Sequence, residues 1–234
     1  MRLPGSLASL NGTMRNILFS KEEGDSLPGK IERIFYINPY GNEVHPMPNP
    51  RVLDALKAAD VLIYSIGSLF TRYSSGFDLL SPISYDLTGS IIPCLIPKGI
   101  AKTIISSNLK HKILLLNNAH DRETTGFRSA TDYVSAIVTA CQDSLRASYI
   151  PLQATETTTW SQFVTHVVYL RECPVHVDVA ELKKSGIECV GVWAGREGVF
   201  EADVLERGLG GICAGRGGGL QRRATVHNWP IVKE

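Results

Sequence analysis

Four mainly apolar runs of strand length constrain this chain more than any other feature. They span residues 61–66, 112–117, 163–170 and 187–193. Apolar runs that lack polar alternation are typical of parallel strands buried on both faces. Because helix signals fall between these runs, the sequence predicts an α/β fold. We expect a Rossmann-like, mainly parallel sheet with helices on both faces.

The expected helices lie before or between the apolar runs. Asn49 and Pro50 are typical of a helix start, which predicts a helix from 50 to about 59. Apolar spacing and capping residues predict further helices over 98–107, 129–141 and 178–184, the last closed by Gly186. An additional strand is expected over 31–37, followed by a turn over 38–42.

The remaining segments lack a helical or strand period. Residues 1–30 are expected to be an irregular lead-in, and 31–200 the α/β domain. Residues 72–89 interrupt that domain at a place where connections normally have about 2–6 residues. Residues 208–219 contain seven glycines. The sequence therefore predicts a flexible Gly/Arg-rich tail over 201–234.

Charge and cysteine content limit the classes of partner. The 24 Lys and Arg residues nearly balance the 23 Asp and Glu residues, which argues against a nucleic-acid-binding surface. No apolar run approaches the ~20 residues that span a bilayer, and the N-terminus lacks a secretory h-region. The five cysteines form no Cys-x-x-Cys pair. We therefore expect reduced, mostly buried thiols in a cytoplasmic protein without a membrane partner, with homo-oligomerisation left open.

Two polar loops follow apolar runs and are candidate ligand sites. One is Gly67-Ser68-Leu69-Phe70-Thr71-Arg72, and the other spans 117–126. Ligands of open α/β sheets bind beyond the carboxyl ends of the strands, where a glycine and hydroxyl groups let an anion approach closely. The alternatives are a capped tight turn and a solvated surface loop. His176 and Asp178 form a weaker candidate metal pair, because no further ligand follows at metal spacing.

A family resemblance extends over residues 31–142. The residues that carry it, in chain order, are Ala58-Ala59-Asp60-Val61-Leu62-Ile63, Gly67-Ser68-Leu69-Phe70-Thr71, Ile91-Ile92-Pro93-Cys94-Leu95-Ile96-Pro97-Lys98-Gly99-Ile100, Asn117, Glu123-Thr124 and Thr131-Asp132-Tyr133-Val134. This series resembles the CofD-like family, which comprises 2-phospho-L-lactate transferase and the YvcK-type gluconeogenesis factors. Its fungal members are the most similar.

The resemblance implies a Rossmann-like fold and a ligand that carries a nucleotide or phosphate. It implies a transferase acting on a nucleotide-activated phosphoester; the alternatives are a regulator that binds a nucleotide sugar without turnover, and an inactive fragment of either. Whether the chain is an enzyme stays open, and no catalytic residue is assigned. The residues carried over are Gly67, Ser68, Leu69 and Thr71 for the phosphate, Asn117 with Asn118 for the ligand, and Asp121 and Glu123 for Mg²⁺.

The chain departs from the family pattern in three places. The family begins with a Gly-rich phosphate loop and a first half-sheet, which do not precede Ile31, so the fold is expected to be incomplete at the N-terminus. Asp121-Arg122 replaces the family's Pro-Gly. Joining Thr71 to Ser90 restores the family's run, and 72–89 is therefore hypothesised to be a retained intron. Transcript reads that contain this segment would contradict the hypothesis.

Overall fold

A four-stranded parallel sheet forms the centre of the molecule. The computed structural model describes residues 27, 29–65, 67–70, 90–148, 159–194 and 199–214. The strands are β3 (Val61–Tyr64), β4 (His111–Leu115), β5 (His166–Leu170) and β6 (Glu188–Val192), and they lie side by side in that order. All three pairings are parallel. The four apolar runs therefore form the predicted sheet, which confirms the α/β fold class.

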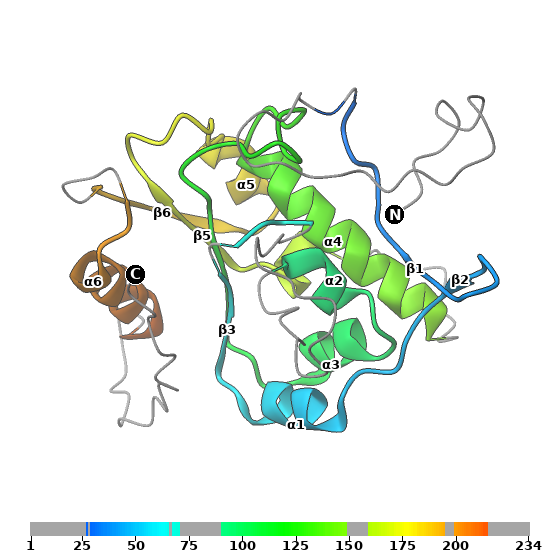
Figure 1. Cartoon of the computed structure of the whole chain (residues 1–234). Helices are drawn as coiled ribbons and strands as arrows, with labels where there is room; N and C mark the ends of the chain where they lie inside the picture. Colours follow the sequence, from blue (N-terminus) through cyan, green and yellow to red (C-terminus); the bar gives the residue numbers. More distant parts are fainter. Residues whose placement is uncertain are drawn as a thin grey trace, which may run out of the picture.

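Helices cover the two faces of the sheet unequally (Figure 1). The strands β3 to β6 follow one another in space as they do in sequence, so right-handed connections place their helices on one face. That face packs Leu114 and Val167 against α2 (Ile91–Leu95), α3 (Ile100–Ser106), α4 (Ala130–Ala147) and α5 (Val179–Lys184). On the opposite face, Ile113 and Val168 pack against Ile212 of α6 (Ala202–Ala214).

The tail prediction is wrong for residues 202–214, which form helix α6. The glycine content of this segment suggested that it could not bury enough apolar surface to order itself. However, Leu205, Leu209 and Ile212 recur at helical spacing and turn one apolar stripe toward the sheet. Tertiary packing on the second sheet face thus outweighs the low helix propensity of the glycines. Residues 215–234 lie outside the described part of the chain.

The segment around the predicted first strand differs from expectation in length and in partner. Only Tyr36–Ile37 is a strand (β1), and it pairs antiparallel with Glu43–Val44 (β2) in a separate ribbon. The turn between them is as predicted. The Asn38 side-chain oxygen accepts the N–H groups of Tyr40 and Asn42, and Gly41 adopts a positive φ of 83°. Tyr36 also donates its hydroxyl to the Pro93 carbonyl, which joins this ribbon to α2.

Most helix boundaries agree with the sequence. Helix α1 (Pro50–Ala58) begins at the Asn49 cap, whose side chain accepts the Arg51 N–H. Helix α5 begins at Asp178, which accepts the Glu181 N–H, and Gly186 follows it with φ 77°. The sequence missed α2, and α4 continues six residues beyond the predicted end at 141. A 3₁₀ turn over Trp160–Gln162 shortens the expected β5 to His166–Leu170.

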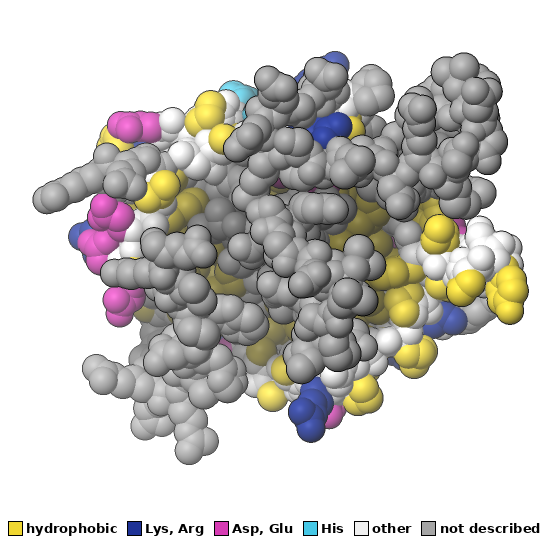
Figure 2. Space-filling model, in the orientation of Figure 1, with side chains coloured by type: hydrophobic (Ala, Val, Ile, Leu, Met, Phe, Trp, Pro, Cys, Tyr) yellow, Lys and Arg dark blue, Asp and Glu magenta, His cyan; other side chains and the backbone are white. Residues whose placement is uncertain are grey.

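The cysteine expectation is correct only in part. All five cysteines are free, but only Cys141 is buried, and Cys94 is exposed. Among the residues that the structure describes, no helix has the length and apolarity to cross a membrane. Figure 2 shows one face of the molecule, on which the Lys and Arg side chains of the described residues are scattered rather than gathered in a stripe.

Candidate active site

The two predicted polar loops meet at the carboxyl edge of the sheet. Gly67 and Ser68 follow β3, and Asn117 follows β4, its neighbour in the sheet. The Ser68 hydroxyl donates to Glu123 Oε2 at 2.8 Å, and Asn117 Nδ2 donates to the Gly67 carbonyl at 3.2 Å. Loops that are about 50 residues apart in sequence therefore form one polar surface, as their positions after parallel strands predicted.

The Gly67–Leu69 loop offers a ligand fewer groups than the sequence suggested. The Gly67 N–H donates to the Ser65 carbonyl at 2.8 Å, so it is already used. The Leu69 side chain is only 1% exposed and belongs to the hydrophobic core, so only the backbone of Leu69 could contact a ligand. Ser68 remains the polar side chain of the loop. Thr71, the fourth predicted phosphate contact, lies outside the described residues.

Asp121 has a structural function within its own loop. Its Oδ1 accepts the N–H groups of Glu123 and Thr124 and the Thr124 hydroxyl, at 2.8–3.0 Å. The Thr124 side chain is buried, so this network fixes the turn that presents Glu123 to Ser68. The two carboxylates that the sequence assigned together to Mg²⁺ thus differ in function: Asp121 holds the turn, and Glu123 contacts the opposite loop.

Tyr133 of α4 anchors the same loop by contacting the imidazole of His120. Burial raises the pKa of Tyr133 to about 12, so its hydroxyl is protonated at neutral pH. That hydroxyl lies 3.2 Å from His120 Nδ1, and the two rings are stacked with centroids 6.1 Å apart. A phenol that donates to Nδ1 places the proton of a neutral His120 on Nε2.

Cys173 extends the polar edge to the loop after β5. Its thiol donates to the carbonyls of Asn117 and Asn118 at 3.4 Å, and its sulfur accepts the Val175 N–H at 3.3 Å. Burial raises the pKa of this thiol. A protonated thiol suits its position as a donor between two backbone loops. Cys173 was not predicted from the sequence, although its position three residues after a predicted strand was a usable signal.

The weaker metal pair of the sequence analysis has a structural explanation. His176 is exposed and pairs through its backbone with Ser129, and Asp178 caps α5. Within the described part of the chain, no group of three His, Cys, Asp or Glu side chains is arranged to hold a metal ion. A divalent cation at the carboxyl edge would thus depend on Glu123 together with oxygen atoms of the ligand, which is a common arrangement for Mg²⁺.

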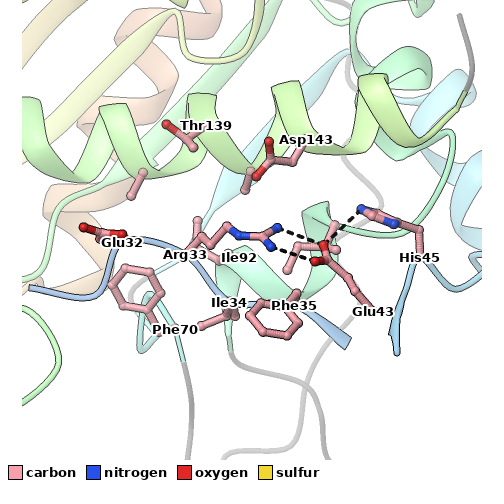
Figure 3. Close-up of a pocket in the computed structure, with 13 residues that line it drawn as sticks. Glu32, Arg33, Ile34, Phe35, Glu43, His45, Phe70, Ile92, Thr139 and Asp143 are labelled. Carbon is pink, nitrogen blue, oxygen red and sulfur yellow. Dashed lines mark hydrogen bonds and ion pairs between the residues drawn. The ribbon is translucent and has the colours of Figure 1, made fainter. Parts of the chain in front are cut away.

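Two cavities lined by described residues lie away from the Ser68–Glu123 contact, and neither suits a phosphate ligand. Arg33, Glu43 and His45 line the cavity drawn in Figure 3, where the guanidinium faces the Glu43 carboxylate at 2.6 and 2.8 Å. Its accessible volume is about 20 Å³, which is room for one water molecule.

The second cavity is an apolar groove of about 350 Å³ beside strand β3. It is lined from β3, α1, α2 and α3 by Val52, Leu56, Leu62, Ile63, Tyr64, Ser65, Ser90, Ile91, Cys94, Leu95, Ile100 and Ile104. No charged side chain is among these residues, so the groove does not provide the charge that holds a phosphate. The sequence did not predict it, because it arises where α1 packs without burying any residue fully.

Comparison with known proteins gives matches in sequence and in structure. An uncharacterized protein of Saccharomyces cerevisiae, YNL011C, is 33% identical over 194 residues, which are 82% of this chain and 39% of the yeast protein. The crystal structure of protein BH3568 from Bacillus halodurans aligns with a TM-score of 0.46 and 20% identity, over 70% of this chain and 44% of that one. No family model matches the chain. The chain thus spans about two-fifths of the length of its yeast relative.

Proposed function

We propose that this protein binds a phosphate-bearing small molecule, a nucleotide or nucleotide sugar, at the carboxyl edge of β3 and β4. The observation that carries the proposal is the contact between Ser68 and Glu123, which brings together two loops that follow adjacent parallel strands. The Ser68 hydroxyl, turning from Glu123 to the ligand, and the backbone of Ser68 and Leu69 would bind the phosphate, and Asn117 and Asn118 would contact the rest of the ligand.

The first candidate activity is transfer of a group from a nucleotide-activated phosphoester, as the sequence resemblance implies. Such transfers depend mainly on positioning and on neutralising developing charge, rather than on a covalent intermediate with the protein. Glu123 would hold Mg²⁺ jointly with the ligand's phosphate oxygens, and the cation would supply the charge neutralisation. Asp121 would act indirectly, because the turn that it caps sets the position of Glu123.

A second candidate is a regulator that binds the nucleotide sugar without turnover. The engagement of Asp121 in its own turn favours it, because this leaves a single carboxylate, Glu123, in contact with the phosphate loop. Phosphoryl-transfer sites usually hold their metal through more than one protein oxygen. The two candidates share the ligand and differ in whether a product is released and whether binding requires Mg²⁺.

Isothermal titration with UDP-sugars and guanylyl compounds, with and without Mg²⁺, tests the proposal. We expect the Ser68→Ala variant to bind the same ligand about tenfold more weakly, because it loses a hydroxyl donor and the contact that joins the two loops. Ser106→Ala, an exposed serine at the end of α3, is the matched control and should bind normally. Equal affinity of the Ser68→Ala variant and the unaltered protein would contradict the position of the site.

Product analysis by chromatography after the same incubations separates the two candidates. Binding that requires Mg²⁺ and is followed by a new phosphorus-containing product supports the transferase. Binding that is independent of metal, with the ligand recovered unchanged, supports the regulator. Failure of all the nucleotides to bind would contradict both.

A further inference from the structure

An exposed tryptophan with an arginine against its ring lies at the carboxyl ends of β5 and β6, the two strands on the far side of β4 from the phosphate loop. Trp193 directly follows β6, and its side chain is 64% exposed. Arg171 directly follows β5, and its Cζ lies 5.2 Å from the centroid of the Trp193 ring. All four strands are parallel, so this pair lies at the same edge of the sheet as Ser68 and Asn117.

The Arg171–Trp193 pair is held in place by the sheet. The Arg171 N–H donates to the Val192 carbonyl at 2.9 Å, which continues the β5–β6 pairing by one residue and sets Arg171 beside Trp193. Arg171 Nε also donates to the Gly191 carbonyl at 3.0 Å. Arg171 is thus held once through its backbone and once through its guanidinium, which lies over the indole ring.

Gly191 makes room for this arrangement. A Cβ atom at this position would lie 3.1 Å from Arg171 Cγ and 3.0 Å from the end of the Tyr169 ring. Both distances are shorter than most Cβ contacts, so a larger residue would require the Arg171 and Tyr169 side chains to shift by a few tenths of an ångström. The glycine of β6 therefore has a positional role: it allows a long cationic side chain to lie across the strand and reach the indole.

A continuous series of contacts connects the pair to the phosphate loop. Cys173, two residues after Arg171, donates its thiol to the Asn117 and Asn118 carbonyls, and Asn117 donates to the Gly67 carbonyl. With about 4.8 Å between neighbouring strands, the end of β6 lies about 14 Å from the end of β3. An extended nucleotide with a short phosphate chain has a comparable length.

We propose that Trp193 and Arg171 bind the base of the nucleotide whose phosphate is held at Ser68; the inference rests on the proposed function. Any base can stack on an aromatic side chain, because every base has a π-face. Arg171 covers one face of the indole by a cation–π contact, which makes the ring a fixed platform and leaves the other face for the base. Within the described residues, only Nε of the guanidinium has a hydrogen-bond acceptor, so its terminal N–H groups suit a base carbonyl.

Titrations of UDP and of inorganic pyrophosphate, which lacks a base, test the platform. The chain has three tryptophans, and quenching of Trp193 fluorescence reports stacking directly. We expect Trp193→Ala to lower the affinity for UDP about 10- to 100-fold and to leave the affinity for pyrophosphate unchanged. Trp193→Phe keeps an aromatic face and should retain most of the affinity for UDP. Trp160→Phe, in the 3₁₀ turn at the opposite end of β5, is the control and should retain both affinity and quenching.

The pattern of losses distinguishes the two proposals. If Ser68→Ala lowers the affinity for both ligands while Trp193→Ala lowers neither affinity, the base site is wrong and the phosphate site stands. If neither UDP nor pyrophosphate binds the unaltered protein, the proposed function and the base site both fail. If Trp193→Ala changes the sedimentation coefficient but not UDP affinity, Trp193 contacts another protein molecule, and the base site is overturned.

Discussion

At the scale of single residues, the amino ends of β4, β5 and β6 carry a titratable cluster, at the end of the strands opposite to the candidate site. His166 begins β5, and its Nε2 lies 3.6 Å from Glu188 Oε2 at the start of β6. The His111 ring at the start of β4 lies 5.3 Å away, centroid to centroid. Burial lowers the pKa of His166, with a smaller effect of His111 in the same direction, and Glu188 opposes both.

This lowered pKa makes the stability of the protein depend on pH. His166 binds its proton less readily when folded than when unfolded, so the free energy of unfolding rises with pH between the lowered folded value and about 6.5. The stabilisation is complete above about 6.5 and is lost as the pH falls through the folded pKa. Urea unfolding at pH 7.5 and 5 should show a smaller difference for His166→Gln than for the unaltered protein. The exposed His176→Gln variant should behave like the unaltered protein, and an unchanged difference for His166→Gln would contradict this assignment.

The candidate site was predictable where it depends on position along a strand, and unpredictable where it depends on contacts. Ser68, Asn117 and Glu123 were found because they follow apolar runs that end at one edge of a parallel sheet. The turn-fixing function of Asp121 and the thiol contact of Cys173 were not found. Both depend on which backbone groups a loop leaves without a partner, which is a property of the folded loop and not of its residue types.

At the scale of elements, helix α2 has its first turn completed by a distant part of the chain. The Ile91 N–H donates to the Ser68 carbonyl at 3.3 Å, and the Ile92 N–H donates to the Leu69 carbonyl at 2.9 Å. These are N–H groups that a helix start normally leaves without a partner. Pro93 lies in the same turn, where the N–H group that proline lacks would have had no partner within the helix. A five-residue helix with an internal proline has too little periodicity to be recognised from sequence.

This bonding predicts that residues 71–89 can be removed without loss of the fold. Joining Phe70 to Ser90 would convert both bonds into the i to i−4 spacing of an α-helix. We expect the shortened protein to unfold cooperatively in urea and to be more stable by about 1–3 kcal/mol, because folding no longer has to close the connection of 19 residues between Phe70 and Ser90. The variant that joins Thr71 to Ser90 is the comparison: its spacing is one residue longer and it should gain less. Loss of cooperative unfolding in the shorter variant would refute the prediction.

Element order was predictable for a physical reason, and element ends were not. Mainly apolar runs of strand length identify β3 to β6, and caps such as Asn49 and Asp178 identify the starts of α1 and α5. Helix α4 continues past 141 because Ser144 and Leu145 are buried and extend its packed face. Helix α6 depends on the second sheet face for its stability, so its own composition gave a misleading prediction.

At the scale of the whole molecule, the sheet is protected by four helices on one face and by α6 on the other (Figure 1). A protein that ends at Glu201 would leave Ile113, Leu115 and Val168 uncovered. We expect this truncation to bind a hydrophobic dye strongly and to lose more than about 3 kcal/mol of stability, given about 1.5–3 kcal/mol for each buried aliphatic side chain. Truncation after Ala214 keeps α6 and is the control. Normal stability of the shorter protein would show that α6 is dispensable.

The position of α6 after all four strands of the sheet also affects how the protein is made. Leu115 and Ile212, which pack into one cluster, are 97 residues apart. At ~5–20 residues per second, the ribosome needs ~5–20 s to synthesise the second after the first. Until Ile212 is made, the sheet face to which Leu115 belongs has no α6 to cover it. Such intermediates aggregate readily, so the yield of folded protein should depend on chaperones that bind during translation.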